Sequence, residues 1–67
     1  MTATALIIEV TKVHPSIKIG VRRDKTRSYI TYISYPEHNI DEQFGTKEQA
    51  NARAILWKLY KEANNGL

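Results

Sequence analysis

The residues of this chain that are best suited to a chemical role are its cations, and most of them lie close together. Residues 12 to 27 hold six of the ten lysine and arginine residues and only one acid, Asp24. Cations clustered on a small, rigid element produce a positive potential that attracts polyanions such as nucleic acids. The cluster begins at Lys12, and its candidate nucleic-acid or partner contacts are Lys18, Arg22, Arg23, Lys25 and Arg27, together with the aromatic residue Tyr32.

Residues 36 to 48 have the opposite charge. They carry Glu37, Asp41, Glu42 and Glu48 against Lys47 alone. The chain, whose formal net charge is +3, is therefore bipolar as well as basic. Because docking proteins match oppositely charged patches, a basic and an acidic patch on one domain also indicate a protein-interaction module.

Side chains that could perform catalysis or hold a metal are few and scattered. The histidines His14 and His38 lie near prolines, in a predicted turn and a predicted loop, where we expect them to be exposed. Two isolated histidines do not make a metal site. The acids between residues 37 and 42 lack the alternating ligands and central glycine of a calcium-binding loop. Gly20 is a lone glycine in a predicted strand, whereas phosphate cradles are glycine-rich. The sequence thus predicts no enzyme, no cofactor and no metal site.

Length and composition indicate one small domain that covers residues 1–67. The chain has no cysteine, which excludes a disulfide framework and fits a reducing compartment. Its longest apolar run, residues 5 to 8, is too short to cross a membrane, and no basic segment precedes it as in a signal peptide. We therefore expect an intracellular, cytoplasmic protein without membrane contacts.

Three segments have the pattern of strands, after a frayed lead over residues 1–5. Residues 6–13 are rich in β-branched side chains, and residues 17–23 alternate apolar and polar side chains. Residues 28–35 form a further predicted strand, with a polar turn before it and Pro36 after it. An acidic loop follows and can hold a short last strand that ends at Phe44. Strands are thus predicted within residues 6–44.

The aromatic side chains of the strand over residues 28–35 divide between its two faces. Strict alternation places Tyr29 and Tyr35 in the core with Phe44, and Tyr32 on the opposite face with Ile30. Tyr32 then has two possible roles: it stacks on a base or a partner protein, or it covers a cross-strand neighbour.

A helix is predicted over residues 46–64. Thr46 and Gln49 form a capping box after Gly45, no proline interrupts the segment, and Gly66 is a suitable stop. At 100° per residue, one stripe contains Ala52, Leu56, Leu59 and Ala63, and Trp57 lies at its edge. Together these patterns predict an α+β fold: a three- or four-stranded antiparallel sheet with one C-terminal helix packed on one face.

Two stretches resemble known DNA-binding families. Residues 20–25 (GVRRDK) and 29–33 (YITYI), followed by residues 44–50 (FGTKEQA) and Ala54, resemble the APETALA/ethylene-response-factor DNA-binding domain and its phage and homing-endonuclease relatives. They equally resemble the arm-binding domain of tyrosine recombinases. The resemblance covers about residues 17 to 60 and rests on short motifs.

The resemblance implies that the sheet lies in the major groove of DNA and that the helix packs behind it. Arg22 and Arg23 match the strand arginines of these families, Tyr29 matches their core aromatic residue, and Tyr32 stands where they have a polar contact. The chain departs from the pattern in the last strand, where Asp41 and Gln43 replace DNA-facing residues, and at Ser34, which replaces a basic residue. Residues 5–13 have no counterpart in these families.

Two hypotheses of function follow. The first is a small module that binds double-stranded DNA through a basic, exposed sheet face and hairpin, of phage or mobile-element origin. The second is a small inhibitor or adaptor that docks on a partner protein through its bipolar surface. RNA binding and a structural role in a larger assembly complete the alternatives.

Overall fold

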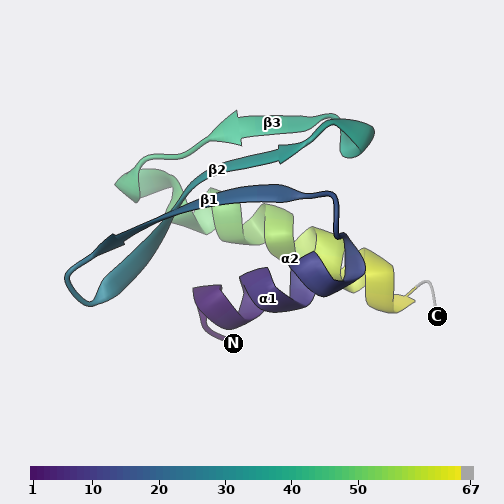
Figure 1. The fold of residues 1–67 in the computed structure, drawn as a ribbon, viewed down its shortest axis with the longest axis horizontal. Helices are drawn as coiled ribbons and strands as arrows, with labels where there is room; N and C mark the ends of the chain where they lie inside the picture. Colours follow the sequence, from purple (N-terminus) through teal and green to yellow (C-terminus); the bar gives the residue numbers. More distant parts are fainter. Residues whose placement is uncertain (66–67) are drawn as a thin grey trace.

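The computed structural model describes the backbone of residues 1–65 and the side chains of residues 1–64. Two helices and three strands follow one another along the chain, with two short 3-10 turns (Figure 1). Their order is α1 (Ala3–Val13), β1 (Lys18–Asp24), β2 (Arg27–Tyr35), the 3-10 turn η1 (Pro36–His38), β3 (Ile40–Gln43), the 3-10 turn η2 (Thr46–Glu48) and α2 (Gln49–Asn65).

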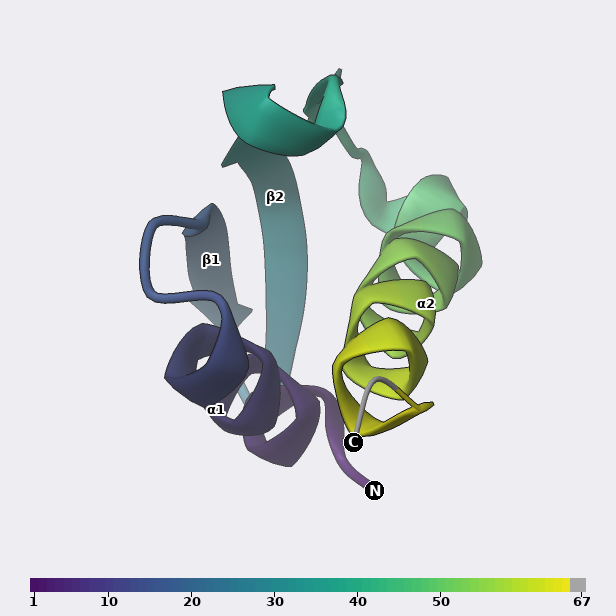
Figure 2. The ribbon, with the colours of Figure 1, turned by 90° about the vertical axis from the view of Figure 1, so that its right-hand side faces the viewer.

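The strands form one antiparallel sheet in the order β1-β2-β3, and both helices lie on the same side of it (Figures 1 and 2). α1 packs chiefly against α2, and α2 packs against β2, the central strand. The predicted α+β class, with an antiparallel sheet and a C-terminal helix on one face, is confirmed, and α1 is an addition to it. None of the helices in residues 1–65 is both long and apolar enough to span a membrane.

The prediction of a strand over residues 6–13, and of a frayed lead before it, is wrong, because this segment belongs to α1. The Thr2 hydroxyl caps the helix by accepting a hydrogen bond from the Ala5 N–H at 3.1 Å. Leu6 and Val10, one helical turn apart, are both completely buried. Burying this pair against α2 and the sheet outweighs the strand preference of the β-branched residues between them. Pro15 follows the end of the helix, where it cannot continue the hydrogen-bond ladder.

β1 and β2 form a hairpin whose two-residue turn places Lys25 in the left-handed region, with φ 53°. The pairing shifts by one residue in the middle of the hairpin. Gly20 pairs with Tyr32 and Val21 with Ile30, so Thr31 is an extra, unpaired residue on β2. Such a β-bulge changes which side chains share a face.

The bulge corrects the predicted faces of β2. Ile33 and Tyr35 are buried as alternation predicts, but Ile30 is buried with them, on the face that lies over the helices. Tyr29, predicted to share the core with Tyr35, pairs instead with Arg22 and is half-buried. Strict alternation therefore predicts the buried face correctly for the residues after the bulge, and it predicts the wrong face for the residues before the bulge.

The core lies between the sheet and the two helices. The stripe predicted for the C-terminal helix is confirmed at Leu56 and Leu59, which are 0% and 2% exposed. Trp57 is half-buried and packs against the edge of the core, as expected. The buried residues are Leu6, Val10, Ile17, Ile30, Ile33, Tyr35, Ala52, Leu56 and Leu59.

The start of the C-terminal helix differs in detail from the predicted cap. Its first turn is the 3-10 turn η2, whose N-cap is Gly45 rather than Thr46. The Glu48 carboxylate accepts a hydrogen bond from the Gly45 N–H at 3.3 Å, and the Gln49 side chain donates to the Gly45 carbonyl at 2.9 Å. The helix continues to Asn65, and the predicted stop at Gly66 lies outside the described residues.

Candidate nucleic-acid interface

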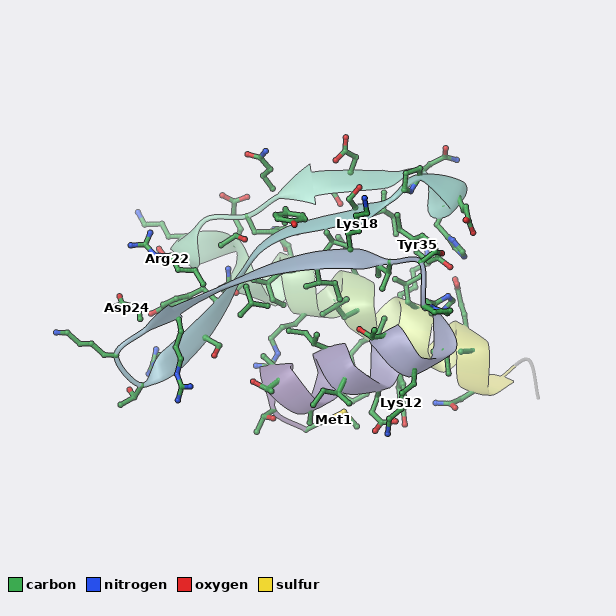
Figure 3. All side chains as sticks on the ribbon, viewed as in Figure 1. Met1, Lys12, Lys18, Arg22, Asp24 and Tyr35 are labelled. Atoms are coloured by element: carbon green, nitrogen blue, oxygen red, sulfur yellow. The ribbon has the colours of Figure 1, made fainter. Side chains whose placement is uncertain are left out.

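The face of the sheet that points away from the helices, here called the outer face, has mixed charge. Alternation along β1 places Lys18, Gly20, Arg22 and Asp24 on it. Pairing across β2 to β3 then brings Asp41 into line with Ser34 and Lys18. Figure 3 shows Lys18 and Arg22 on the sheet and Lys12 on the opposite side of the molecule. The outer face thus contains the predicted cations Lys18 and Arg22 and the acids Asp24 and Asp41, and Asp24 pairs with Arg27 across the end of the hairpin.

Lys12 does not belong to the basic hairpin. It lies in the last turn of α1, where its ammonium group forms an ion pair of 3.3 Å with Glu9. This is the only ion pair among residues 1–64, so the arginine side chains of the described part of the chain are not held by carboxylates.

Tyr32 covers a cross-strand neighbour. Its ring occupies the space that a side chain at Gly20 would fill, and 44% of the residue remains exposed. One side of the ring therefore rests on the β1 backbone, which corresponds to the second of the two roles expected for Tyr32, that of covering a cross-strand neighbour. On the same face, Tyr32 pairs with Gln43 of β3, and Lys18 and Arg22 stand on either side of Gly20 along β1.

Arg23 points to the other side of the hairpin from Arg22. It lines a shallow hollow together with the start of α1. Arg27 lines a second hollow that reaches the start of the C-terminal helix and includes Arg53. The two hollows share Ala3 and Ser28, so they adjoin one another. We call the surface formed by Arg23, Arg27 and Arg53 the arginine end.

Other groups at the arginine end are neutral hydrogen-bonding groups. No carboxylate lines either of these two hollows in the described part of the chain. A third hollow, which shares Tyr29, Thr46 and Gln49 with the second, is lined by Arg22 and Asp24, so one acid lies next to the arginine end. Hydroxyl and amide side chains lie between the arginines, and Tyr29 is the only aromatic residue there. These polar neighbours are Thr2, Thr4, Thr26, Ser28, Thr46 and Gln49.

Three elements position the arginine end. The hairpin turn and the starts of both helices lie at the same end of the molecule (Figure 1). The Arg53 guanidinium donates a hydrogen bond to the Met1 carbonyl at 3.2 Å, which ties α2 to the segment before α1. The first turn of α1 contains no acid, so the partial positive charge of its free N–H groups adds to that of the arginines.

The structure thus brings together only part of the predicted contact set. Arg23 and Arg27 meet at the arginine end, and Lys25 lies beside them at the tip of the hairpin. Lys18, Arg22 and Tyr32 lie on the outer face. Arg53 was not among the predicted contacts. In the sequence, Arg53 stands four residues after Gln49, and this spacing could have indicated that both side chains lie on the same face of the first turns of the helix.

The two histidines lie close together, on either side of Tyr35. His14 is half-buried, contrary to the expectation that it is exposed, while His38 is exposed. Nδ1 of His14 lies 3.0 Å from the Tyr35 hydroxyl, and its Nε2 lies 3.3 Å from the Leu59 carbonyl oxygen. The Tyr35 ring also stacks on His38, with the ring centroids 4.2 Å apart. Within the described residues, no group of three or more histidine and acidic side chains could hold a metal ion.

Comparison with protein-family models, with curated proteins and with solved structures found no match to the chain. The resemblance to DNA-binding families therefore remains an expectation that rests on the short motifs quoted above.

Proposed function

We propose that the chain is a small module that binds double-stranded DNA by holding its phosphate backbone at the arginine end. The observation that supports this proposal is the convergence of Arg23, Arg27 and Arg53 from three elements onto two adjoining hollows with no carboxylate. Arginine forks bind phosphate oxygens through two parallel hydrogen bonds, and the hydroxyl groups around them are further donors.

The chemistry of the arginine end favours phosphates over bases. Single-stranded nucleic acid is usually held by aromatic side chains on which bases stack. Tyr29 is half-buried at this end, and the more exposed Tyr32 lies on the outer face. Backbone contacts without stacking suit a duplex, and they position a protein without reading sequence.

The outer face is the less favourable of the two candidate contact surfaces. Lys18 and Arg22 attract phosphates there, but Asp41 lies in line with Lys18 and repels them. Asp24 pairs with Arg27 and is therefore near both surfaces. The proposed contact therefore moves from the sheet face, where the family resemblance implies it, to the end of the molecule. Arg22 and Lys18 belong to the same hairpin as Arg23 and Arg27, and they add long-range attraction at low salt.

The proposal is tested by the salt dependence of binding to a short mixed-sequence DNA duplex, measured by fluorescence anisotropy. The logarithm of the binding constant should fall linearly with the logarithm of salt concentration, with a slope of about −0.9 for each phosphate contact. The triple variant Arg23→Ala, Arg27→Ala, Arg53→Ala should weaken binding to all sequences. It should also reduce the magnitude of the slope by about 0.9 for each phosphate that the variant no longer holds.

A matched control removes the same charge elsewhere. The variant Lys12→Ala, Lys58→Ala, Lys61→Ala lies on the helices away from the hairpin, and it should leave the slope nearly unchanged. Equal losses in both triple variants would mean that net charge, not the arginine end, causes the binding. Absence of binding to DNA and RNA duplexes at about 50 mM salt, where phosphate contacts are strong, would refute the proposal. Tighter binding of RNA than of DNA would identify RNA as the ligand.

A further inference from the structure

The outer edge of β1 is a second surface without a partner. β1 is an edge strand, and only β2 packs extensively against it. Its seven residues, Lys18–Asp24, form backbone ladder bonds with β2. No other backbone or side-chain hydrogen bond reaches this segment from residues 1–64. Figure 2 shows β1 at the margin of the sheet. Such an edge presents N–H and C=O groups that can pair with an additional strand.

The charges beside this edge favour an acidic partner. Lys18 and Arg22 flank the edge on the outer face, and Arg23 flanks it on the other face. Asp24 is the only acid of the strand and lies next to the turn. Each copy of β1 carries three cations against one acid. Although symmetric antiparallel pairing would place Lys18 opposite Asp24 of the other copy, the excess positive charge of both strands opposes self-pairing.

The opposite edge of the sheet has the reverse character. β3 contains only four residues, and Asp41 and Glu42 are its charged side chains. A second copy of the chain could offer this acidic strand to β1, but it would pair with little more than half of the β1 edge. An extended acidic segment of another protein can pair along the whole strand.

The two faces of β1 also specify the pattern of such a segment. Val21 is 48% exposed and Ile19 is half-buried on the face that lies over the helices. An added strand would place every second side chain on that face, beside these apolar residues, and the remaining side chains on the outer face, beside Lys18 and Arg22. Apolar β-branched residues alternating with glutamate or aspartate fit both faces.

We propose that the β1 edge binds an extended acidic peptide of a partner protein as a fourth strand of the sheet. Backbone hydrogen bonds to β1 give this interaction its affinity, and the alternation of acidic and apolar side chains gives it selectivity. This surface shares Arg23 with the arginine end but differs from it in its other charged contacts, which are Lys18 and Arg22 rather than Arg27 and Arg53.

The probe is a synthetic peptide as long as β1 in which glutamate alternates with valine. Binding is followed by NMR of the labelled protein, through chemical shifts and amide hydrogen exchange. We expect the shifts to concentrate on residues 18–24, and the β1 amides that point away from β2 to exchange several-fold more slowly. The same peptide with N-methyl groups on alternate residues cannot donate these hydrogen bonds and should not bind.

Charge variants test the selectivity. Arg22→Glu should weaken peptide binding about tenfold, since an attraction at an exposed position becomes a repulsion. Lys58→Glu on α2 makes the same kind of charge change and should have little effect. The double variant Arg27→Ala, Arg53→Ala should bind the peptide normally, which separates this proposal from nucleic-acid binding.

Three results would overturn the proposal. The first is equal binding of the N-methylated peptide, because binding would then not use the strand edge. The second is no binding, or shifts confined to α2, to β3 or to the surroundings of Arg27 and Arg53. The third is slower exchange of the β1 amides on concentrating the protein without peptide, which would show that a second copy of the chain occupies the edge.

Discussion

The side-chain amide of Gln49 pairs with both backbone groups of Ile30. Its Oε1 accepts a hydrogen bond from the Ile30 N–H at 2.8 Å, and its Nε2 donates to the Ile30 carbonyl at 2.8 Å. β3 pairs with β2 only from Tyr32 to Tyr35, so the backbone of Ile30 has no neighbouring strand on that side. The amide of Gln49 takes the place of that missing strand and attaches the first turn of α2 to the sheet.

Replacing Gln49 should therefore destabilise the fold more than its partly exposed position suggests. Gln49→Ala leaves the N–H and C=O of Ile30 without these partners, and we expect it to lower the free energy of unfolding by about 1–3 kcal/mol. Urea unfolding measures this loss, and Asn51→Ala, at an exposed position of the same helix, should change stability by less than about 0.5 kcal/mol. Similar values for the two variants would show that the Gln49 bonds add no stability.

Substitution of Gly20 should disturb the hairpin. A Cβ at this position would collide with the Tyr32 ring and would lie 2.6 Å from Oγ1 of Thr31. We expect Gly20→Ala to cost about 1–3 kcal/mol in unfolding free energy, as overpacking typically does. In a thermal or urea melt, combining it with Tyr32→Ser should recover part of the loss. Additive losses would mean that the Tyr32 ring is not the obstacle.

The contact between His14 and Tyr35 should appear as a coupling energy. The Leu59 carbonyl can only accept, so Nε2 of His14 carries the proton, and in the neutral ring Nδ1 accepts from the Tyr35 hydroxyl. A double-mutant cycle with His14→Leu and Tyr35→Phe should give a coupling of about 0.5–1.5 kcal/mol in unfolding free energy. The cycle of His14→Leu with Tyr32→Phe should give a value near zero, and an equal coupling would show that the hydrogen bond is not its cause.

Reversing the charge of Asp41 should distinguish the two candidate contact surfaces for a duplex. Asp41 lies on the outer face, in line with Ser34 and Lys18. If the duplex lies at the arginine end, Asp41→Lys should leave the magnitude of the salt slope of DNA binding almost unchanged. A rise of about 0.9 would reveal a new phosphate contact and would move the interface to the outer face, as the family resemblance implies.

The sequence was sufficient to predict α2 and the hairpin, because several residues that its periodicity places on the inner face are buried. Leu56 and Leu59 have helical spacing and are both buried, and strand alternation correctly placed Ile33 and Tyr35. It was insufficient for α1, since Ile7, Ile8 and Val10 favour strands by local preference. The helix exists because it buries Leu6 and Val10 and is capped by Thr2, and only the completed fold reveals that burial.

The candidate site was harder to predict than the fold. One extra residue, Thr31, reverses the alternation of β2 and moves Tyr29 out of the core and toward Arg22. No local signal in the sequence marks this bulge. Arg53 is far from the basic hairpin along the chain, and it approaches Arg27 only because Gln49 holds the start of α2 against β2.

The bond between Arg53 and the Met1 carbonyl joins residues 52 positions apart in the chain, which has a consequence for the order of folding. Long loops close at a higher entropic cost than short ones, so local contacts tend to form first. The β1–β2 hairpin is local, whereas the docking of α1 on α2 needs almost the entire chain. The hairpin should therefore precede α1 in folding. The arginine end includes residues of the hairpin and of the start of α1, so we expect the surface proposed to hold phosphates to be complete only once α1 has docked.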